Sequence, residues 1–483
     1  MGSFLFLEVF TIVFGLSVAT AMINKRVLGF PAAIGQPIVA AVAVFLLQWA
    51  ASLLAGNQFF TINVHQIEET VRGINFYDFL INGVICFVLT CSALKFKSSD
   101  LKAHWKPITI LATLSLLTCA ILFGCIMYGY QYVIGSPIPL LVLLLVGSAL
   151  GATDPIGIKG VLSSVKAPNH LMVKLEGESL FNDAMCISLF MTILNIIKGG
   201  TLSVAHVIEH LMFEVAVALV IGWAFGRMAL SLLRGKHDME TLILITALLA
   251  SGSYLVALYA HASAPIACVI AGLMVGNKWN EFLKEKDTDE VSHFWHTVEG
   301  IINAFLFTLI GLELFILDLN VLMIMSGVFA FIVLHCSRFI ANFLTFYMFP
   351  NVRKQSLNGS LTILSWGGVR GGISLALVLA VLNVPQLAPY TSFILGYTFI
   401  SVLLSGVVCG LGLPAVMNAF YHNPNEATEG FAGWYQRLCH KMNRTGEKYI
   451  ITLDGNKEED IAIYDPNHVK GSPSVTVDDE HKF

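Results

Sequence analysis

Long apolar blocks, with few charges inside them, run through most of this chain of 483 residues. Residues 110–128 and 321–349 are two such blocks. Blocks of about 20 apolar residues match the thickness of a bilayer core, and helices buried in soluble proteins rarely run so long. Charged residues make up 12% of the chain, half of the roughly 25% found in an ordinary soluble domain. We therefore expect an all-α polytopic membrane protein.

The apolar blocks divide into about thirteen predicted transmembrane helices, near 4–22, 29–53, 77–94, 105–131, 138–160, 173–197, 205–233, 239–258, 261–277, 295–317, 321–349, 358–380 and 390–420. Positive charge between them is uneven. With the N-terminus outside, the inner loops and helix ends hold Lys25, Arg26, Lys95, Lys97, Lys102, Lys106, Lys166, Lys174, Arg234, Lys236, Lys278, Lys284, Lys286, Arg353 and Lys354. The outer ones hold only Arg72 and Lys198. By the positive-inside rule, we expect the polar tail 425–483 to be cytoplasmic. We expect the membrane to be a cell membrane, plasma or inner.

Composition argues against several functional classes. The net charge of −4 gives no reason to expect a nucleic-acid partner. Nine cysteines are scattered without a CxxC pair, which favours buried thiols over a metal site. The phosphate-binding pattern GxxxxGK[ST] does not occur, so a nucleotide-driven pump within this chain is not expected. We predict no cofactor and no enzymatic activity.

Two predicted spans are unusually rich in helix-breaking residues. Residues 147–160 read GSALGATDPIGIKG, and residues 362–376 read TILSWGGVRGGISLA. Proline removes a helix hydrogen bond, and clustered glycine lowers the cost of unwinding. Paired broken helices in two halves of a chain are typical of inverted-repeat transporters, which bind their substrate where the breaks cross. Glycine-mediated helix packing is the alternative, but it does not explain Asp154 or Arg370.

Ionisable residues within predicted spans point to the same region. Asp154 lies in the first broken span, Arg370 in the second, and Glu176, Glu178 and Asp183 in the span between them. Such residues are costly in a membrane and are by default functional. Asp154 and Asp183 are both expected at a depth of roughly 10–15 Å, from the helical rise of 1.5 Å per residue. They are therefore expected to meet.

Two carboxylates, the hydroxyl of Ser179 and loosened backbone carbonyls would form an all-oxygen cage, which suits a hard cation such as Na⁺. Neighbouring carboxylates repel each other, and desolvation disfavours their charged form, so one of them is expected to hold a proton near neutral pH. A group that holds either a proton or a cation couples the two fluxes. The structural alternative is a static buried ion pair, which we favour for Glu178 and Arg370.

The residues around these acids resemble those of a known family. Thr153-Asp154-Pro155, residues 178–183 (ESLFND) and residues 367–371 (GGVRG) are similar to the motifs of the monovalent cation:proton antiporters. The Asn-Asp pair resembles the sodium/proton exchanger branch. Further similarity lies in the tenth span, at Trp295, Asn303, Phe307 and Leu309-Ile310-Gly311-Leu312. The resemblance covers residues 5–420.

The resemblance implies a role for each matching residue. Asp183 would be the main carrier of cation and proton, with Asp154, Ser179 and the Thr153 carbonyl as co-ligands. Asn182 would hold the broken helices by hydrogen bonds, and Glu178 would pair with Arg370. The only metal implied is the transported Na⁺, with Li⁺ or K⁺ left open. The implied exchange is electroneutral.

The resemblance also implies an architecture. A transmembrane domain, 1–424, would contain a moving core bundle (about 105–197 and 321–420) and interface helices (about 4–94 and 239–317), and it would form a homodimer in the lipid bilayer. One departure concerns the third span, where some prokaryotic members carry an acid in a motif resembling FEGAL. Residues 89–94 here read LTCSAL and contain no carboxylate.

Two rival functions stay open from the sequence. His206-Val207-Ile208-Glu209-His210 fits the HxxEH metalloprotease pattern, although a five-residue pattern is easily met by chance and no third ligand lies nearby. A cation channel would need a continuous pore, whereas carboxylates beside broken helices suit a closed, alternating site.

Overall fold

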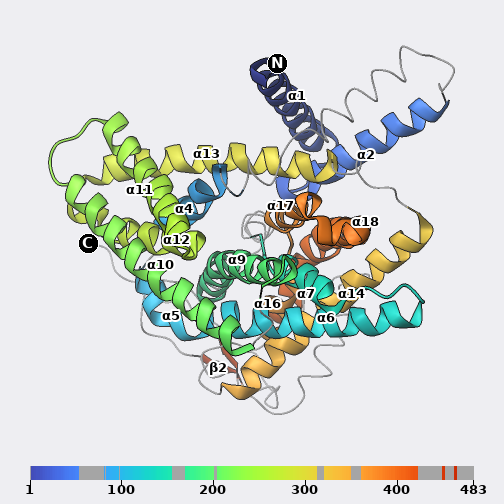
Figure 1. Cartoon of the computed structure of the whole chain (residues 1–483). Coiled ribbons are helices and arrows are strands. Elements are labelled where there is room, and N and C mark those ends of the chain that lie inside the picture. The colour runs from blue at the N-terminus through green and yellow to red at the C-terminus, as the bar shows by residue number, and fades with distance from the viewer. Residues whose placement is uncertain are drawn as a thin grey trace, which may run out of the picture. The chain divides into compact units, whose positions relative to one another are not determined.

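A computed structural model describes residues 2–53, 81, 83–96, 98–154, 169–200, 204–312, 320–349, 360–421, 449–451 and 462–464 (Figure 1). The chain divides into two compact units, Met1–Tyr421 and His422–Phe483. Every described element of the first unit is a helix. In the second unit, strands β1 (Tyr449–Ile451) and β2 (Ala462–Tyr464) form an antiparallel pair in which Ile450 lies opposite Ile463.

The α-helices of the first unit are α1 (Gly2–Ile23), α2 (Ala32–Leu53), α4 (Ile85–Lys95), α5 (Ser98–Ile110), α6 (Leu116–Val133), α7 (Leu140–Ala149), α9 (Asn169–Ile197), α10 (Val204–Leu232), α11 (Met239–Tyr259), α12 (Ala264–Gly276), α13 (Glu285–Leu312), α14 (Val321–Met348), α16 (Ser360–Trp366), α17 (Gly372–Leu379), α18 (Thr391–Leu404) and α19 (Leu411–Tyr421). Short π-helical segments are η1 (Asn24–Leu28), η3 (Leu111–Ser115) and η8 (Ser405–Gly410). Short 3₁₀ segments are η4 (Trp279–Glu281), η6 (Ala380–Asn383) and η7 (Pro385–Tyr390).

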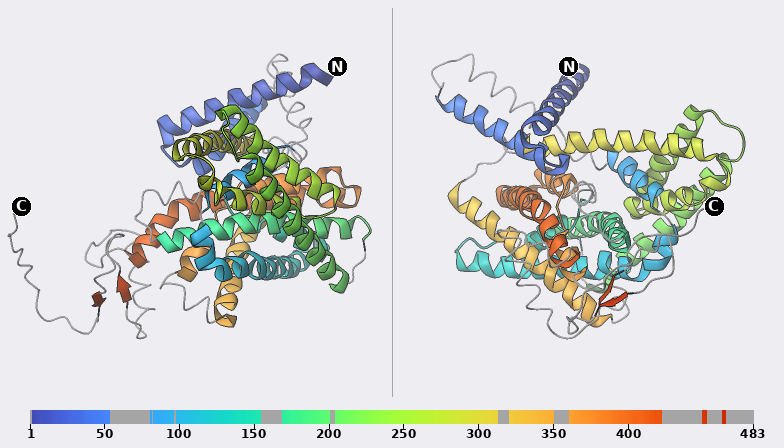
Figure 2. Two further views of the ribbon diagram at one scale, coloured as in Figure 1. Left: turned by 90° about the vertical axis from the view of Figure 1, so that its left-hand side faces the viewer. Right: turned by 180° about the vertical axis from the view of Figure 1, so that it is seen from behind.

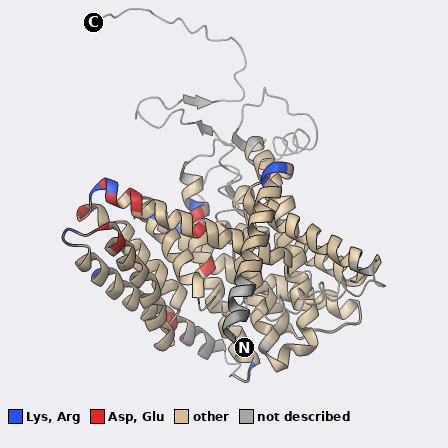
Figure 3. Ribbon diagram, turned by 90° about the horizontal axis from the view of Figure 1, so that it is seen from above, with Lys and Arg blue, Asp and Glu red and all other residues tan. Residues whose placement is uncertain are grey.

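Among the described residues, nine helical stretches are long and apolar enough to cross a membrane. The chain is therefore a multi-pass membrane protein. Three further apolar helices, at 85–95, 140–149 and 372–382, are shorter. Figure 3 shows how few charged residues interrupt the described helices. The predicted total of thirteen includes stretches outside the described residues, so that number stays a prediction.

Helix α9 is the most buried of the nine candidate spans. It packs against α5, η3, α7 and α12 and lies in the middle of the first unit (Figures 1 and 2). Helix α13 packs along α2, and α14 packs along α6 and α18. Local chemistry fixes some of the helix starts: the side chain of Asn320 accepts a hydrogen bond from the backbone N–H of Met323 at 2.8 Å and caps α14.

The second of the two predicted broken spans is confirmed. Helix α16 ends at Trp366 and α17 begins at Gly372, with non-helical residues between them. Before the first break, α7 ends at Ala149, and the following residues up to Asp154 are not α-helical. The continuation of that span, from Pro155, lies outside the described residues.

Close packing of α13 on α2 depends on Gly311. A Cβ atom at this position would lie 2.2 Å from the Cβ of Ala40 and 2.6 Å from the backbone nitrogen of Ala41. We expect Gly311→Ala to destabilise the protein by about 1–3 kcal/mol, because the two backbones must move apart. Thermal unfolding of the purified protein in detergent measures this.

Gly300, on the same helix, has no atom within 4 Å of the corresponding position. Gly300→Ala is therefore the matched control, and it should leave stability unchanged or raise it by up to ~1 kcal/mol through helix propensity. Equal losses in the two variants would show that the contact with α2 is not what Gly311 provides.

Candidate cation site between two broken helices

The two broken segments touch each other directly. The backbone N–H of Asp154 donates to the carbonyl of Val369 at 2.8 Å. A Cβ atom at Gly371 would lie 2.9 Å from the Cβ of Asp154, so only glycine allows this approach. The predicted crossing of the two breaks is thus present in the structure.

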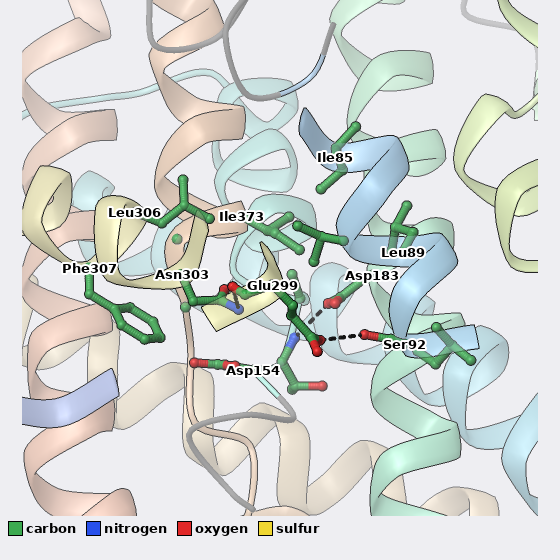
Figure 4. A pocket seen from close by; sticks show the side chains of 16 residues that line it. Ile85, Leu89, Ser92, Asp154, Asp183, Glu299, Asn303, Leu306, Phe307 and Ile373 are labelled. Carbon is green, nitrogen blue, oxygen red and sulfur yellow. Dashed lines mark hydrogen bonds between the residues drawn. The ribbon is translucent and has the colours of Figure 1, made fainter. Parts of the chain in front are cut away.

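Both predicted carboxylates lie beside this crossing. Asp154 is 9% exposed and Asp183 is 5% exposed. Asp183 comes from α9, and its Oδ1 accepts a hydrogen bond from the backbone N–H of Thr153 at 3.2 Å. Both aspartates line a cavity of about 40 Å³ (Figure 4), which exceeds the roughly 10–15 Å³ that one water needs. The space is large enough for a small cation with part of its hydration.

Polar groups from α9 support the backbone of the first break. The hydroxyl of Ser179 donates to the carbonyl of Thr153, and the Thr153 hydroxyl donates to the Ser179 hydroxyl at 3.1 Å. The Asn182 amide donates to the carbonyl of Gly151 at 2.8 Å and to the Thr153 hydroxyl at 3.3 Å. The structure thus brings together Thr153, Ser179, Asn182 and Asp183, as the sequence predicts. Whether each binds the ion stays a prediction.

The predicted pairing of Glu178 with Arg370 is wrong. Glu178 forms its ion pair with Arg338 of α14, at 2.7 Å between Oε1 and Nη2, and both side chains are buried. The guanidinium of Arg370 instead donates to the carbonyls of Gly151 and Ala152, at 2.5 and 3.0 Å. These carbonyls belong to the non-helical residues after the end of α7, and buried backbone carbonyls need such donors.

Arg338 donates hydrogen bonds to a backbone carbonyl at the second break. Its Nε and Nη2 donate to the carbonyl of Leu364, in the last turn of α16, at 3.3 and 3.2 Å. Positive charge near the carboxyl end of a helix is favourable, because the helix dipole is negative there. Each interrupted helix end therefore has its own buried arginine, Arg370 at α7 and Arg338 at α16.

One acid in the cavity was missed by the sequence interpretation. Glu299, on α13, lines the same cavity as Asp154 and Asp183 (Figure 4). Its Oε1 accepts a hydrogen bond from Ser92 at 3.0 Å. Ser92 belongs to residues 89–94 of α4, the stretch that contains no carboxylate of its own. The position of Glu299 inside a predicted span was the available signal. Glu176, by contrast, is on α9 but does not line the cavity.

Two interrupted helical segments that touch each other, with carboxylates buried beside the contact, are typical of secondary transporters. Comparisons with known proteins agree. Residues 16–419 match the family described as sodium/hydrogen exchanger, transmembrane. The chain belongs to this family.

Individual relatives are consistent with that membership. The Na⁺/H⁺ antiporter NhaP of Pseudomonas aeruginosa is 31% identical over 414 residues, covering 84% of this chain and 96% of that protein. The Na⁺/H⁺ antiporter NhaG of Bacillus atrophaeus is 29% identical over 348 residues, covering 69% and 62%. Among solved structures, the sodium proton antiporter MjNhaP1 of Methanocaldococcus jannaschii has a similar fold, with a TM-score of 0.67 at 18% identity, covering 87% of this chain and 100% of that one.

Proposed function

We propose that this chain is a secondary active antiporter that exchanges Na⁺ for H⁺ across the membrane. The observation that carries the proposal is the pair of buried aspartates, Asp154 and Asp183, on one cavity at the crossing of two broken helices. Relatives named as Na⁺/H⁺ antiporters support the choice of ions.

The proposed mechanism is competition for one site. Two carboxylates in a low-dielectric cavity repel each other. Binding of one positive charge, either H⁺ or Na⁺, relieves this repulsion and stabilises the pair. Asp183 is the group that takes up the proton when Na⁺ leaves. Asp154, the Ser179 hydroxyl and the Thr153 carbonyl are the remaining ligands. Oxygen ligands suit Na⁺ because it is a hard cation.

Alternating access completes the proposal. The bundle of about 105–197 and 321–420 moves against the helices of about 4–94 and 239–317, which hold two copies together as a homodimer. The N-terminus faces outward, and the tail 425–483 is cytoplasmic, because positive charge gathers on the inner loops. The membrane is the cell membrane, plasma or inner.

The rival functions have no support among the relatives. A channel differs from an exchanger in one measurable respect, because an exchanger moves cations against their gradient when it is driven by protons. Purified protein in vesicles with an inside-acid pH gradient and the same Na⁺ concentration on both sides should therefore accumulate Na⁺ in the lumen while the lumen becomes more alkaline, as reported by tracer Na⁺ and a pH-sensitive dye. Parallel additions of Li⁺ and K⁺ measure selectivity. A lumen that stays acidic in Na⁺, Li⁺ and K⁺ alike would overturn the proposal.

A further inference from the structure

The cavity contains a third acid that the proposed mechanism does not use. Glu299 of α13 lines it together with Asp154 and Asp183 (Figure 4). The Glu299 side chain is 9% exposed. A carboxylate so deeply buried needs a positive charge or hydrogen-bond donors to stay ionised.

Donors reach Glu299 from one face of α4. Its Oε1 accepts from the Ser92 hydroxyl at 3.0 Å, and its Oε2 accepts from the Cys91 thiol at 3.4 Å and from the Lys95 ammonium at 2.5 Å. Positions four apart lie on the same helix face, so Cys91 and Lys95 approach the carboxylate together. Lys95 is the last residue of α4.

Lys95 and Glu299 differ in exposure. The Lys95 side chain is 26% exposed, against 9% for Glu299, and Lys95 does not line the cavity whereas Glu299 and Ser92 do. The ammonium therefore holds the carboxylate from the more exposed side, while the same carboxylate faces the cavity that contains the two aspartates. A cation that enters this cavity therefore finds the Glu299 carboxylate already paired with the Lys95 ammonium.

We propose that Glu299 is a third cation-attracting residue of this site and that the Lys95 ammonium competes with the transported cation for it. This inference rests on the proposed exchange function. With the cavity empty of Na⁺, Lys95 neutralises Glu299. An arriving Na⁺ takes over part of that carboxylate's charge on its way to the aspartates, and Lys95 turns toward the more exposed side. Lysine suits this role because its ammonium is a point charge on a flexible stem.

The two partners should shift cation affinity in opposite directions. Glu299→Gln removes one negative charge from the cavity, so the apparent KM for Na⁺ should rise. The rise should be on the order of tenfold, which is the effect of one unit charge on a cation about 10 Å away at an effective dielectric constant of about 20. Lys95→Met removes the competitor, so the apparent KM should fall. Both are measured by Na⁺-dependent exchange in vesicles at alkaline pH, where proton competition is weakest.

If the Lys95–Glu299 ion pair only holds α4 and α13 together, a different result is expected. Either substitution would then lower thermal stability, and the apparent KM would change in the same direction in both variants or in neither. The double variant separates the two accounts further: in a Glu299→Gln background, Lys95→Met should lower the KM by a smaller factor than in the wild-type background, because the competition for Glu299 is gone.

The matched control is the ion pair Lys286–Glu290 on α13, the helix that carries Glu299. Its side chains are 83% and 51% exposed, and 3.8 Å separates Nζ of Lys286 from Oε1 of Glu290. Lys286→Met and Glu290→Gln should leave the KM at the wild-type value. Same-direction or absent shifts at Lys95 and Glu299, with a wild type that exchanges Na⁺ normally, would overturn this inference alone. A wild type without Na⁺-dependent exchange would instead overturn the proposed function.

Discussion

Asp183→Asn should reduce exchange to the level of protein-free vesicles while leaving expression and thermal stability near the wild-type values. An amide neither takes up a proton nor offers a full negative charge, so both halves of the exchange are lost together. The fold should persist, because the asparagine oxygen can still accept the hydrogen bond that the Thr153 N–H donates to Asp183 at 3.2 Å. The substitution also removes repulsion with Asp154.

Size-exclusion elution and thermal unfolding confirm that the Asp183→Asn protein is folded before its transport is measured in vesicles. Glu209→Gln is the control, because Glu209 is an exposed acid of α10 that does not line the cavity, and it should transport like the wild type. Wild-type rates from Asp183→Asn would remove Asp183 from the role of shared carrier.

Arg338→Ala should lower stability by about 3–5 kcal/mol, the usual loss when one partner of a buried ion pair is removed. The substitution strands the Glu178 carboxylate, which Arg338 contacts at 2.7 Å, and it leaves the Leu364 carbonyl at the end of α16 without its donor. The first effect lies on α9 and the second at the end of α16. Low yield, a reduced unfolding temperature and impaired transport are the expected results.

Adding Glu178→Gln should recover part of the stability lost in Arg338→Ala, because a neutral amide is less costly to bury than an unpaired carboxylate. The same substitution should not rescue Arg370→Ala, since Arg370 contacts the carbonyls of Gly151 and Ala152 rather than Glu178. Rescue of Arg370→Ala together with failure to rescue Arg338→Ala would restore the pairing predicted from sequence and contradict the structure.

The position of the cavity was predictable because its causes are local in the sequence. Glycine and proline mark where a helix is interrupted, as at residues 367–371. Helical spacing then puts Ser179 and Asp183 on one face, and depth estimates bring Asp154 to the same level. These arguments use short distances along the chain, and the structure brings these residues together.

The partner of Glu178 was not predictable in the same way. Arg338 and Arg370 are both arginines in predicted spans, and each is far from Glu178 along the sequence. Which one reaches the carboxylate depends on how α14 and α16 pack, which no local pattern encodes. Glu299 was missed for another reason. Acids within membrane spans are functional candidates by default, and Glu299 is such an acid. However, Glu299 lies near the start of the predicted span 295–317, where charged residues are common.

The most direct test of a single site shared by Na⁺ and H⁺ is the dependence of exchange kinetics on pH, measured over a Na⁺ series between about pH 6 and 9. If protons and Na⁺ compete, acidification raises the apparent KM for Na⁺ by about tenfold per unit below the pKa of the site, because each unit makes the proton ten times more concentrated. The maximal rate at saturating Na⁺ stays the same. Deleting residues 425–483 serves as the control and should leave this dependence unchanged. A maximal rate that falls with acid at constant KM, or acid inhibition that disappears with the tail, would contradict the shared site.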